Sequence, residues 1–470
     1  MNYILLLGII LTISVLSCKL TNRRGVPILV GFILIGALIG VWFGFDNVKY
    51  AELICNFALV FIMFTGGFQT DFAKVKPALA VSTLLSALGT VLTAGAAAAF
   101  AYFILNMGFH ASMLLGAVIS ATDAASVFSV LSSKKLNLKN NLGSILQMES
   151  GSNDPFAYML TIVFLSLATG ESQNIVVLLL KQLIIGAAIG IVGAKLGQFV
   201  INKLHLKIDG LYIILLCGIA ILMFGTAGLL DGNGFLALYI GGIILGNSKL
   251  IYKRFLSRML SVTSMLMQIV LFVVLGMLWV PGSFLMSMLV GLIFAIFLFF
   301  FARPAIVFLL MKPFGYKIKE IVLVSWAGFR GASSIVFATY LLTAKLPYAN
   351  YIFNLVFFVC MLSVIFQGSL LAPLTKRLKL GESEDKSTKS IEKIVKDSKN
   401  ELLEFEVTYD SIVFGKSISE LDLPKDISIM MIKRDEKYLM PIKTEKFMEN
   451  DILLITSNYK NWAEAIKWGE

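Results

Sequence analysis

The stretch 118-VISATDAASVFSV-130 belongs to a run of residues that is hydrophobic enough to cross a membrane, yet it contains Asp123. A charged side chain at the centre of a bilayer costs about 2.5–3.5 kcal/mol even on a lenient scale. The residues next to Asp123 are small or form hydrogen bonds, so a helix can unwind at this point. We therefore expect a transmembrane helix that is interrupted at Asp123.

A second segment, 323-LVSWAGFRGASSIVFA-338, has the same character, and 330-RGAS-333 matches 123-DAAS-126. These segments are the fifth and the twelfth of the candidate spans, so they cross the membrane in opposite directions. This arrangement is typical of an inverted repeat whose discontinuous helices meet at the midplane. Facing half-helix N-termini carry partial positive charge and facing C-termini partial negative charge. The negative charge of Asp123 suits the N-terminal ends, and the positive charge of Arg330 suits the C-terminal ends.

The composition is that of a membrane protein. Hydrophobic residues make up 58% of the 470-residue chain, charged residues make up 15%, and the mean hydropathy is +0.85. A soluble domain is roughly a quarter charged, so we predict that the lipid bilayer surrounds most of this chain. The net charge of +11 comes from Lys and Arg in short loops between apolar runs, so we expect no nucleic-acid partner. The cysteines lack metal-ligand spacing and are expected to be buried hydrophobic residues: Cys18, Cys55, Cys217 and Cys360.

A helix needs about 20 apolar residues to span a bilayer, and the sequence contains thirteen candidates. The predicted fold is an α-helical polytopic membrane protein with about 13 transmembrane helices, inverted repeats and crossed discontinuous helices. The candidate spans are 3–18, 26–44, 51–69, 78–106, 110–132, 142–169, 173–202, 209–230, 234–248, 260–280, 283–312, 320–344 and 350–374.

The distribution of Lys and Arg supports this count. Loops after odd-numbered spans hold twenty of these residues, whereas loops after even-numbered spans hold two, Lys49 and Lys345. Basic loops are retained in the cytoplasm. We therefore predict a multi-pass protein of the cell membrane with its N-terminus outside and its C-terminus in the cytoplasm.

The composition changes after Leu380. Residues 381–400 are charged and polar, as in a linker or a solvated helix, and we predict a linker. We predict a transmembrane domain at residues 1–380 and a small cytoplasmic α/β domain at residues 401–470. The β-type runs of the second domain are 402–409, 427–434 and 452–456.

A second polar cluster, 147-QMESGSNDPF-156, lies inside the sixth span. On a helix, Glu149 and Asn153 are one turn apart, and so are Ser150 and Asp154, so these side chains form two adjacent polar ridges. Their oxygens are hard ligands that suit a small monovalent cation. An interhelical hydrogen-bond cluster is the alternative, although two carboxylates are poorly suited to that role.

Two small features of this cluster favour an ion site. Gly151 allows another backbone to approach closely. Pro155 lacks a backbone N–H and clashes with the carbonyl of Gly151, which leaves that oxygen free to face a cation or water.

The other polar residues near the spans do not indicate a functional site. Lys181 and Arg303 are expected to extend toward the outer and inner membrane surfaces, respectively. The two histidines, His110 and His205, lie near loops, and no nucleophile–base or phosphate-loop motif stands out. We therefore expect no enzymatic activity.

These motifs resemble those of monovalent cation/proton antiporters of the NhaP type, including the potassium/proton members called cell-volume-regulation proteins. The likeness runs across the whole membrane part, and the combination of ESGSNDP with ATD and WAGFRGA is highly specific. The matching segments are 23-RRGVPILVGFILIGALIG-40, 121-ATDAASV-127, 149-ESGSNDP-155, 233-NGFLALYIGGIILGN-247 and 319-KEIVLVSWAGFRGASS-334.

The resemblance implies a ligand set. Asp154 resembles the residue that binds cation and proton in turn. Asp123 and the backbone at Thr122 resemble the contribution of an unwound helix, and Ser150 resembles a further ligand. A monovalent cation is therefore expected at Asp154 and Asp123, and no cofactor is expected.

The resemblance also implies a supporting framework. Glu149 and Arg330 resemble a buried ion pair that holds a mobile core together, with Asn153 in an adjacent structural role. This core would move against a dimer-forming scaffold, so a homodimer is expected. One departure is 64-FTGGF-68, where Thr65 replaces an acidic residue of many relatives and leaves cation selectivity open.

The segments 413-VFGKSISELDLP-424 and 449-ENDILLITSN-458 resemble the TrkA-C (RCK C-terminal) regulatory domain. Such domains often pair into dimers and bind small ligands. The resemblance implies a regulator such as a cyclic dinucleotide or a nucleotide at this domain.

The expected function is secondary active exchange of a monovalent cation for protons by alternating access, electroneutral at one for one, for cation and pH homeostasis. Burial disfavours a charged carboxylate and a bound cation favours it, so proton and cation compete for Asp154. K⁺ is favoured because of the appended domain, and a Na⁺-specific antiporter is an alternative. A ligand-gated cation channel is a further alternative, but no filter such as TVGYG occurs. A non-transporting membrane sensor is another alternative, but a sensor would have no need of the residues that resemble cation ligands.

Overall fold

The computed structural model divides into two compact units, Met1–Glu382 and Ser383–Glu470, each of which is described by itself. Most of the predicted linker, residues 384–399, lies outside the described residues. The described residues are 8, 12–14, 28–43, 47–134, 136–170, 174–204, 206, 208–279, 284–383, 400–409, 411, 413–421, 427–434, 437–442 and 446–458.

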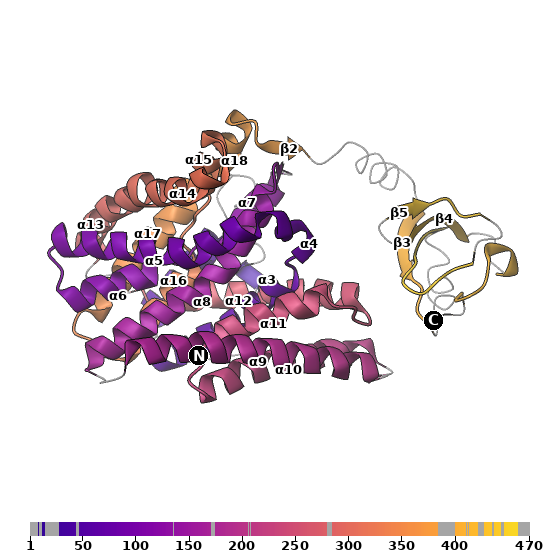
Figure 1. Cartoon of the computed structure of the whole chain (residues 1–470), viewed down its shortest axis with the longest axis horizontal. Coiled ribbons are helices and arrows are strands. Elements are labelled where there is room, and N and C mark those ends of the chain that lie inside the picture. The colour runs from indigo at the N-terminus through magenta and orange to yellow at the C-terminus, as the bar shows by residue number, and fades with distance from the viewer. Residues whose placement is uncertain are drawn as a thin grey trace. The chain divides into compact units, whose positions relative to one another are not determined.

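The first unit is a bundle of helices (Figure 1). Within lipid, only internal hydrogen bonds can satisfy the backbone, so the apolar runs of the sequence form helices. They are α2 (Ile28–Phe43), α3 (Val48–Phe68), α4 (Phe72–Val75), α5 (Leu79–Phe103), α6 (Phe109–Ile119), α7 (Ala124–Ser133), α8 (Leu142–Thr169), α9 (Ile175–Lys203), α10 (Asp209–Leu229), α11 (Gly234–Asn247), α12 (Lys253–Met277), α13 (Phe284–Phe297), α14 (Arg303–Met311), α15 (Ile318–Trp326), α16 (Ala332–Thr343), α17 (Ala349–Leu362) and α18 (Gly368–Arg377).

Shorter elements connect these helices. One π-helical turn, Leu298–Ala302, joins α13 to α14, and another, Ser363–Gln367, joins α17 to α18. Two short strands, β1 (Leu136–Leu138) and β2 (Gly381–Ser383), pair with each other.

The polytopic helical fold predicted from the sequence is confirmed. Among the described residues, seven helical segments are long and apolar enough to cross a membrane, and four shorter apolar helices accompany them. The predicted spans from 26–44 onward all fall on described helices. Of the first predicted span, 3–18, only residues 8 and 12–14 are described, so the count of thirteen stays a prediction.

Two segments that were predicted to be discontinuous helices are interrupted. α6 ends at Ile119 and α7 begins at Ala124, whereas α15 ends at Trp326 and α16 begins at Ala332. The two interruptions meet, because the backbone N–H of Asp123 donates a 2.8 Å hydrogen bond to the carbonyl of Phe329. The crossed arrangement predicted from the two similar motifs is therefore present.

The long helices pack in two groups. In the first, which we call the core group, α5 contacts α6, α8 and α14, and α13 contacts α17. In the second, which we call the scaffold group, α3 contacts α11 and α12, α2 contacts α12, and α9 contacts α10 and α11. α16 contacts both α17 and α3, so it lies where the two groups meet.

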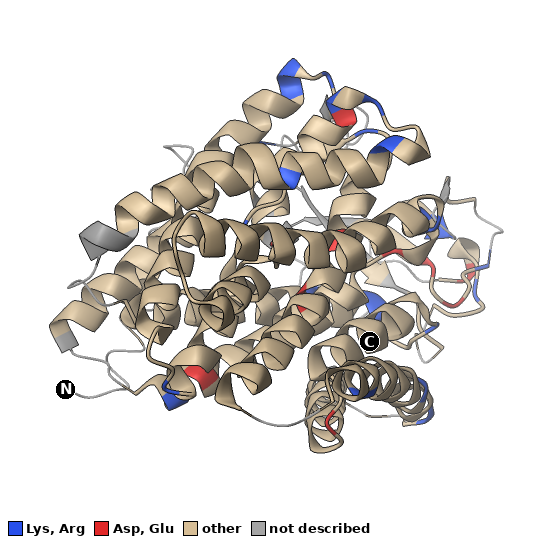
Figure 2. Cartoon of the chain, turned by 60° about the vertical axis from the view of Figure 1, so that its left-hand side comes forward, with Lys and Arg blue, Asp and Glu red and all other residues tan. Residues whose placement is uncertain are grey.

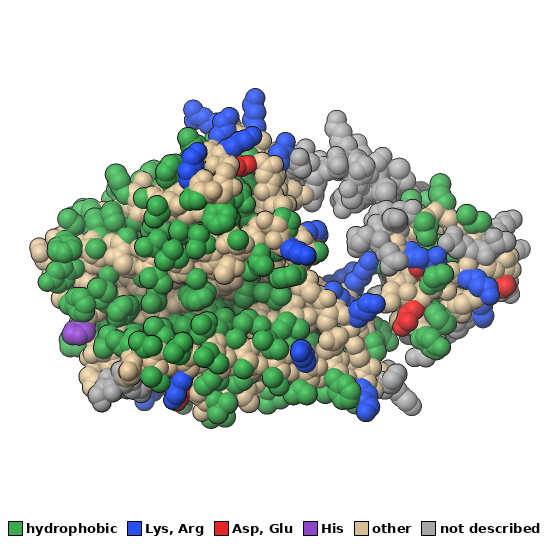
Figure 3. All heavy atoms as spheres, in the orientation of Figure 1, with side chains coloured by type: hydrophobic (Ala, Val, Ile, Leu, Met, Phe, Trp, Pro, Cys, Tyr) green, Lys and Arg blue, Asp and Glu red, His purple; other side chains and the backbone are tan. Residues whose placement is uncertain are grey.

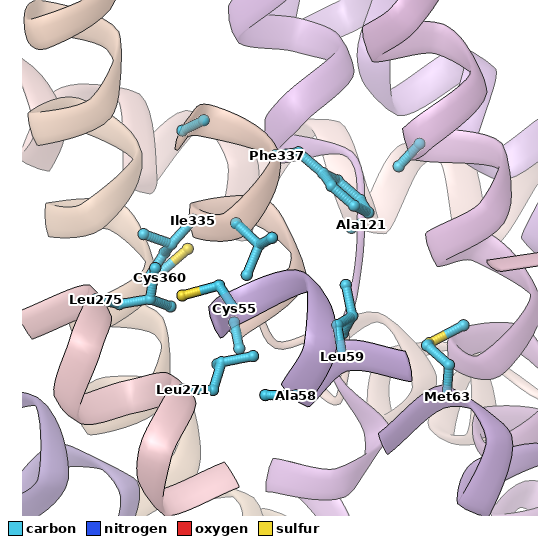
Figure 4. Packing of buried hydrophobic residues seen from close by; sticks show 14 of the residues in the cluster. Cys55, Ala58, Leu59, Met63, Ala121, Leu271, Leu275, Ile335, Phe337 and Cys360 are labelled. Atoms are coloured by element: carbon cyan, nitrogen blue, oxygen red, sulfur yellow. The ribbon is translucent and has the colours of Figure 1, made fainter. Parts of the chain in front are cut away.

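Small and apolar side chains allow these helices to pack closely. A Cβ atom at Gly67 of α3 would clash with the backbone of Tyr239 in α11, so these two helices require glycine at this crossing. Figure 4 shows Cys55 beside Leu271 and Leu275 in the apolar core. The burial predicted for the cysteines is confirmed at Cys55 and at residue 360, whereas residue 217 is half-buried and residue 18 lies outside the described residues.

The surface of the membrane unit is apolar. Hydrophobic side chains cover most of the face seen in Figure 3, and Lys and Arg lie mainly at its margins. Figure 2 likewise shows that Lys and Arg lie mostly near helix ends. The least buried long spans are Ile175–Lys203 and Gly210–Leu229, with 17% and 28% of their apolar windows buried. These helices lie side by side at the lower edge in Figure 1 and present the apolar surface expected in contact with lipid.

The second unit contains a four-stranded antiparallel sheet of β3 (Asn400–Glu406), β4 (Ile427–Arg434), β5 (Lys437–Leu439) and β6 (Ile452–Asn458), in the order β3-β6-β4-β5. A buried apolar cluster that includes Val407, Ile432 and Leu453 packs against it. Arg434 donates two hydrogen bonds to Asp451, at 2.8 and 2.7 Å. The three predicted β-type runs are confirmed by β3, β4 and β6, whereas β5 was not predicted.

Candidate ion-binding site

The polar cluster of the sixth span lies on α8, which continues as a helix through Pro155. As the spacing predicted, Glu149, Ser150, Asn153 and Asp154 are all buried within the bundle, and the exposed fraction of Asp154 is 6%. The close neighbour of Gly151 is the side chain of Tyr239 rather than another backbone. The prediction of a backbone contact was wrong there, because a tyrosine ring of α11 fills the space that glycine leaves.

Only one of the two carboxylate oxygens of Asp154 accepts a hydrogen bond from a described residue. Its Oδ2 accepts a 2.6 Å hydrogen bond from the hydroxyl of Ser333, in the first turn of α16. Its Oδ1 is buried and accepts no hydrogen bond from any described residue. A buried carboxylate with one unpaired oxygen is costly unless a proton or a cation accompanies it.

Asp123 lies at the start of α7. Its Oδ1 accepts a 3.2 Å hydrogen bond from the backbone N–H of Ser126, and its Oδ2 accepts a 2.5 Å bond from the Ser126 hydroxyl. An acidic side chain in this position caps the helix and stabilises the positive end of its dipole. The prediction that a negatively charged side chain lies at the N-terminus of this half-helix is therefore confirmed.

Thr122 joins the interrupted helix to α8. Its carbonyl accepts a 2.7 Å hydrogen bond from the hydroxyl of Ser150, and its hydroxyl accepts a hydrogen bond from the Asn153 amide. The structure thus brings Thr122 and Ser150 together within one hydrogen-bonded network that adjoins Asp154 and Asp123.

Arg330 binds the C-terminal end of α6, on the other side of the helix break from Asp123. Its Nη1 donates to the carbonyls of Ser120 and Ala121, at 2.8 and 3.1 Å. These carbonyls lie at the C-terminal end of α6, where the helix no longer provides partners for them. The backbone N–H of Arg330 donates to the hydroxyl of Ser363 at 2.8 Å, so the π-helical turn before α18 holds this residue in place.

The ion pair of Glu149 differs from the prediction. Its carboxylate pairs with Arg303, and both side chains are almost completely buried. The predicted pair of Glu149 with Arg330 is absent from the ion pairs of the described residues, because the guanidinium of Arg330 is directed to the α6 carbonyls. The predicted extension of Arg303 to the inner surface was also wrong. Arg303 follows a π-helical turn within a long apolar segment and is 3% exposed.

Lys181 extends to the surface as expected and forms an exposed ion pair with Asp231 at 3.4 Å. His110 is exposed, and His205 lies outside the described residues.

A cavity of about 420 Å³ reaches Asp154. It is lined from α8 by Ser150 and Asp154, from the helix breaks by Asp123 and Ser333, and from α3 by Thr65. It also includes Gln69 and Gln147, and Gln69 is exposed at the end of α3. The cavity therefore extends from the neighbourhood of Asp154 to the exposed end of α3.

The structure adds one residue that sequence reasoning missed, Ser333. Ser333 was visible in the sequence, because it occupies the position of Ser126 in the two similar motifs, but its bond to Asp154 depends on the crossing of α8 and α16. Thr65 lines the cavity and donates a weak 3.5 Å hydrogen bond to the carbonyl of Leu260. No group of three or more His, Cys, Asp or Glu that could hold a metal ion occurs among the described residues.

Two family models match the chain. The family model for the transmembrane sodium/hydrogen exchanger matches residues 8–377. The chain belongs to this family. The exchanger is thus a membrane transporter and not an enzyme. A second family model, that of the TrkA-C domain, matches residues 402–468.

Two similar antiporters align with nearly the whole length of the exchanger. The K(+)/H(+) antiporter NhaP of Alkalimonas amylolytica is 33% identical over 462 residues, which are 96% of this chain and 80% of that protein. The K(+)/H(+) antiporter NhaP2 of Shewanella oneidensis is 30% identical over 473 residues, with 98% and 82% covered.

The sodium proton antiporter MjNhaP1 from Methanocaldococcus jannaschii has a similar solved structure. Its TM-score is 0.72 at 23% identity, over 80% of the exchanger and 98% of MjNhaP1. At this identity the likeness shows that the two proteins share a fold.

Proposed function

We propose that the exchanger is a secondary active antiporter that exchanges one monovalent cation, preferably K⁺, for one proton. The observation that carries this proposal is the state of Asp154, a buried carboxylate with one oxygen bonded to Ser333 and the other without a partner among the described residues. Asp154 also lines the cavity that extends to the exposed end of α3. A side chain placed in this way binds a proton or a cation but is costly when it binds neither.

Competition at Asp154 explains why exchange is obligatory. Burial disfavours the charged carboxylate, and a bound cation favours it, so each ligand expels the other. If the site crosses the barrier only when it is neutralised, each cycle moves one cation in one direction and one proton in the other. A tenfold gradient supplies about 1.4 kcal/mol at 25 °C, so no other energy source is needed.

The cation ligands that we propose are oxygens of Asp154, Asp123, Ser150 and Thr122. The hydroxyl of Ser150 donates to the carbonyl of Thr122, but a hydroxyl oxygen has two lone pairs with which it can still bind a cation. The buried pair of Glu149 with Arg303 serves to hold α8 against α14. Asn153 frames the site through its bond to the Thr122 hydroxyl.

The preference for K⁺ is supported by the two relatives named K(+)/H(+) antiporters, which match the exchanger over nearly its whole length. MjNhaP1 is named as a sodium proton antiporter but shares only 23% identity. Thr65 places a neutral hydroxyl at the cavity, where it leaves both K⁺ and Na⁺ as candidates. Exchange of Na⁺ for protons is therefore the second candidate.

We further propose that the cavity at Asp154 faces the cytoplasm in this structure. The cavity includes the end of α3 at Gln69, and the next loop contains Lys74 and Lys76, which the distribution of basic residues assigns to the cytoplasm. In the same way we propose a cell-membrane protein with its N-terminus outside. Movement of the core group against the scaffold group would then open the site to the other side.

Two further proposals concern regulation and assembly. We propose that the TrkA-C domain binds a small regulator such as a cyclic dinucleotide or a nucleotide, and that the exchanger is a homodimer. Removal of residues 381–470 should change the response of exchange to pH and to the candidate ligands. An unchanged response would contradict the regulatory role of the TrkA-C domain. Native mass spectrometry tests the assembly, and a monomer would contradict the proposed homodimer.

Proton flux in proteoliposomes tests the transport proposal. K⁺, Na⁺ and Li⁺ are offered separately to purified protein, and the internal pH is followed with a dye. We expect the largest flux with K⁺ and none in Asp154→Asn. Asp231→Asn is the matched control, because this carboxylate is exposed and lies in a loop. Cation-dependent proton flux through Asp154→Asn would show that Asp154 is not the shared site.

A further inference from the structure

A second cavity, of about 690 Å³, lies against the N-terminal half of α3. The cavity at Asp154 lies against the C-terminal half of the same helix. Glu52 in the second cavity and Thr65 in the first are 13 residues apart in the sequence, which corresponds to about 20 Å along a helix. The two cavities thus approach the bundle from opposite ends of α3.

Hydrogen bonds connect α3 to α16 beside this second cavity. The hydroxyl of Thr343 donates to Oε2 of Glu52, and the hydroxyl of Tyr340 donates to Oδ1 of Asn56 at 2.6 Å. α3 belongs to the scaffold group, whereas α16 begins beside the site, where Ser333 bonds Asp154. These two bonds therefore tie the scaffold group to the helix that reaches the ion site.

An aromatic cluster lies between the second cavity and Asp154. Tyr158, one turn after Asp154 on α8, has ring-centroid distances of 5.1 Å to Phe235 and 6.0 Å to Tyr340. Phe235 in turn lies 5.1 Å from Phe224, which lines the second cavity. These packed rings connect the lining of the second cavity to the part of α8 next to Asp154.

We propose that Glu52 and Asn56 form the outer gate of the transport path, and that Glu52 is the first point at which a monovalent cation binds from that side. Among the described residues that line the second cavity, Glu52 is the only acidic one. Its bond to Thr343 closes the gate in this structure. When the core group moves, the bonds from Thr343 and Tyr340 break, and the carboxylate of Glu52, which already lines the cavity, is released to bind the incoming cation. The inference rests on the proposed antiport function.

The charge of Glu52 can be tested apart from its hydrogen bond. In Glu52→Gln the amide oxygen still accepts from Thr343, but the negative charge is lost. We expect the K⁺ concentration for half-maximal exchange to rise about three- to tenfold on the outer face of the membrane and to stay unchanged on the inner face. Right-side-out and inside-out membrane vesicles containing the full-length protein give the two values. Glu52→Asp should restore the outer value, and Lys49→Gln, which removes a positive charge from the same cavity, should lower it.

The hydrogen bonds of the gate make a different prediction. Tyr340→Phe and Thr343→Val remove one donor each and leave the charge of Glu52 in place. Because they weaken only the closed gate, the outward-facing state becomes more populated. The half-maximal K⁺ concentration should then fall on the outer face and rise on the inner face, each by about two- to tenfold. Thr339→Val is the matched control, because among the described residues the hydroxyl of Thr339 bonds only to the carbonyl of Val336 within the same helix.

The outcomes separate this inference from the proposed function. Wild-type vesicles without K⁺-dependent proton exchange would overturn the function. Normal wild-type exchange with unchanged outer values in Glu52→Gln would overturn the cation-binding role of Glu52 alone. Shifts of the same sign on both faces in Tyr340→Phe and Thr343→Val, or no shift, would overturn the gate.

Discussion

The hydroxyl of Ser333 donates a 2.6 Å hydrogen bond to Oδ2 of Asp154, and this bond joins the first turn of α16 to the middle of α8. One carboxylate oxygen is thereby fixed, and the other, Oδ1, is buried and accepts no hydrogen bond from a described residue. The same helix, α16, extends from this bond to the Thr343 hydroxyl at the second cavity. Binding at Asp154 and closure of the proposed gate are thus connected through one rigid helix.

The bond from Ser333 should be important for cation affinity. In Ser333→Ala the carboxylate of Asp154 loses a partner that holds its orientation. Hydrogen bonds to charged groups contribute about 1.5–3 kcal/mol, so the half-maximal K⁺ concentration in proteoliposomes should rise about tenfold or more. Ser334→Ala is the matched control, because the neighbouring hydroxyl makes only a 3.5 Å contact with the Ala121 carbonyl. An equal effect of both substitutions would show that the loss is not specific to Asp154.

The ion pair of Glu149 with Arg303 should dominate the stability of α8 against α14. Arg303→Met leaves a buried carboxylate without a partner and should cost about 3–5 kcal/mol, measured as a lowered midpoint of thermal unfolding in detergent. Addition of Glu149→Gln should recover much of this loss. In Arg330→Met the same second substitution should give little recovery, because Arg330 bonds backbone carbonyls. The opposite pattern of recovery would support the predicted pair that the structure lacks.

The two roles of Asp123 can be separated. Asp123→Asn keeps a side-chain oxygen that caps α7, so thermal stability should change little. Asp123→Ala removes the cap as well and should cost about 1 kcal/mol. Both variants should lose K⁺-dependent proton flux if the carboxylate binds the cation. Full flux in Asp123→Asn would leave Asp123 with a capping role only.

The contact of Gly151 with Tyr239 predicts a steric effect. A Cβ atom at Gly151 would lie 2.7 Å from the Cζ atom of Tyr239, so Gly151→Ala should destabilise the protein by about 1–3 kcal/mol. Tyr239→Leu in the same chain should remove most of this cost because it vacates the space. If the double variant is as unstable as Gly151→Ala alone, the clash is elsewhere. Thermal unfolding of the four proteins provides the comparison.

The interrupted helices were predictable from the sequence because polar and small residues within an apolar span leave few structural solutions. Asp123 and Arg330 have the charges that helix ends attract, and their spans cross in opposite directions. The four polar residues of α8 were likewise placed correctly, since helical periodicity alone puts them on one side. The choice of partner for Glu149 was not predictable in this way. It depends on which of two buried arginines lies nearer, and that distance is set by the packing of α14.

The sequence by itself therefore determined the lipid environment, the helical segments, the two breaks and the set of oxygen-bearing residues near them. These features follow from local rules, namely hydropathy, helical spacing and the cost of burying charge. The tertiary structure decided that Ser333 orients Asp154, that Arg303 neutralises Glu149, and that Arg330 serves the carbonyls of α6. Contacts of this kind join residues more than a hundred positions apart, and their geometry exists only once the helices have packed.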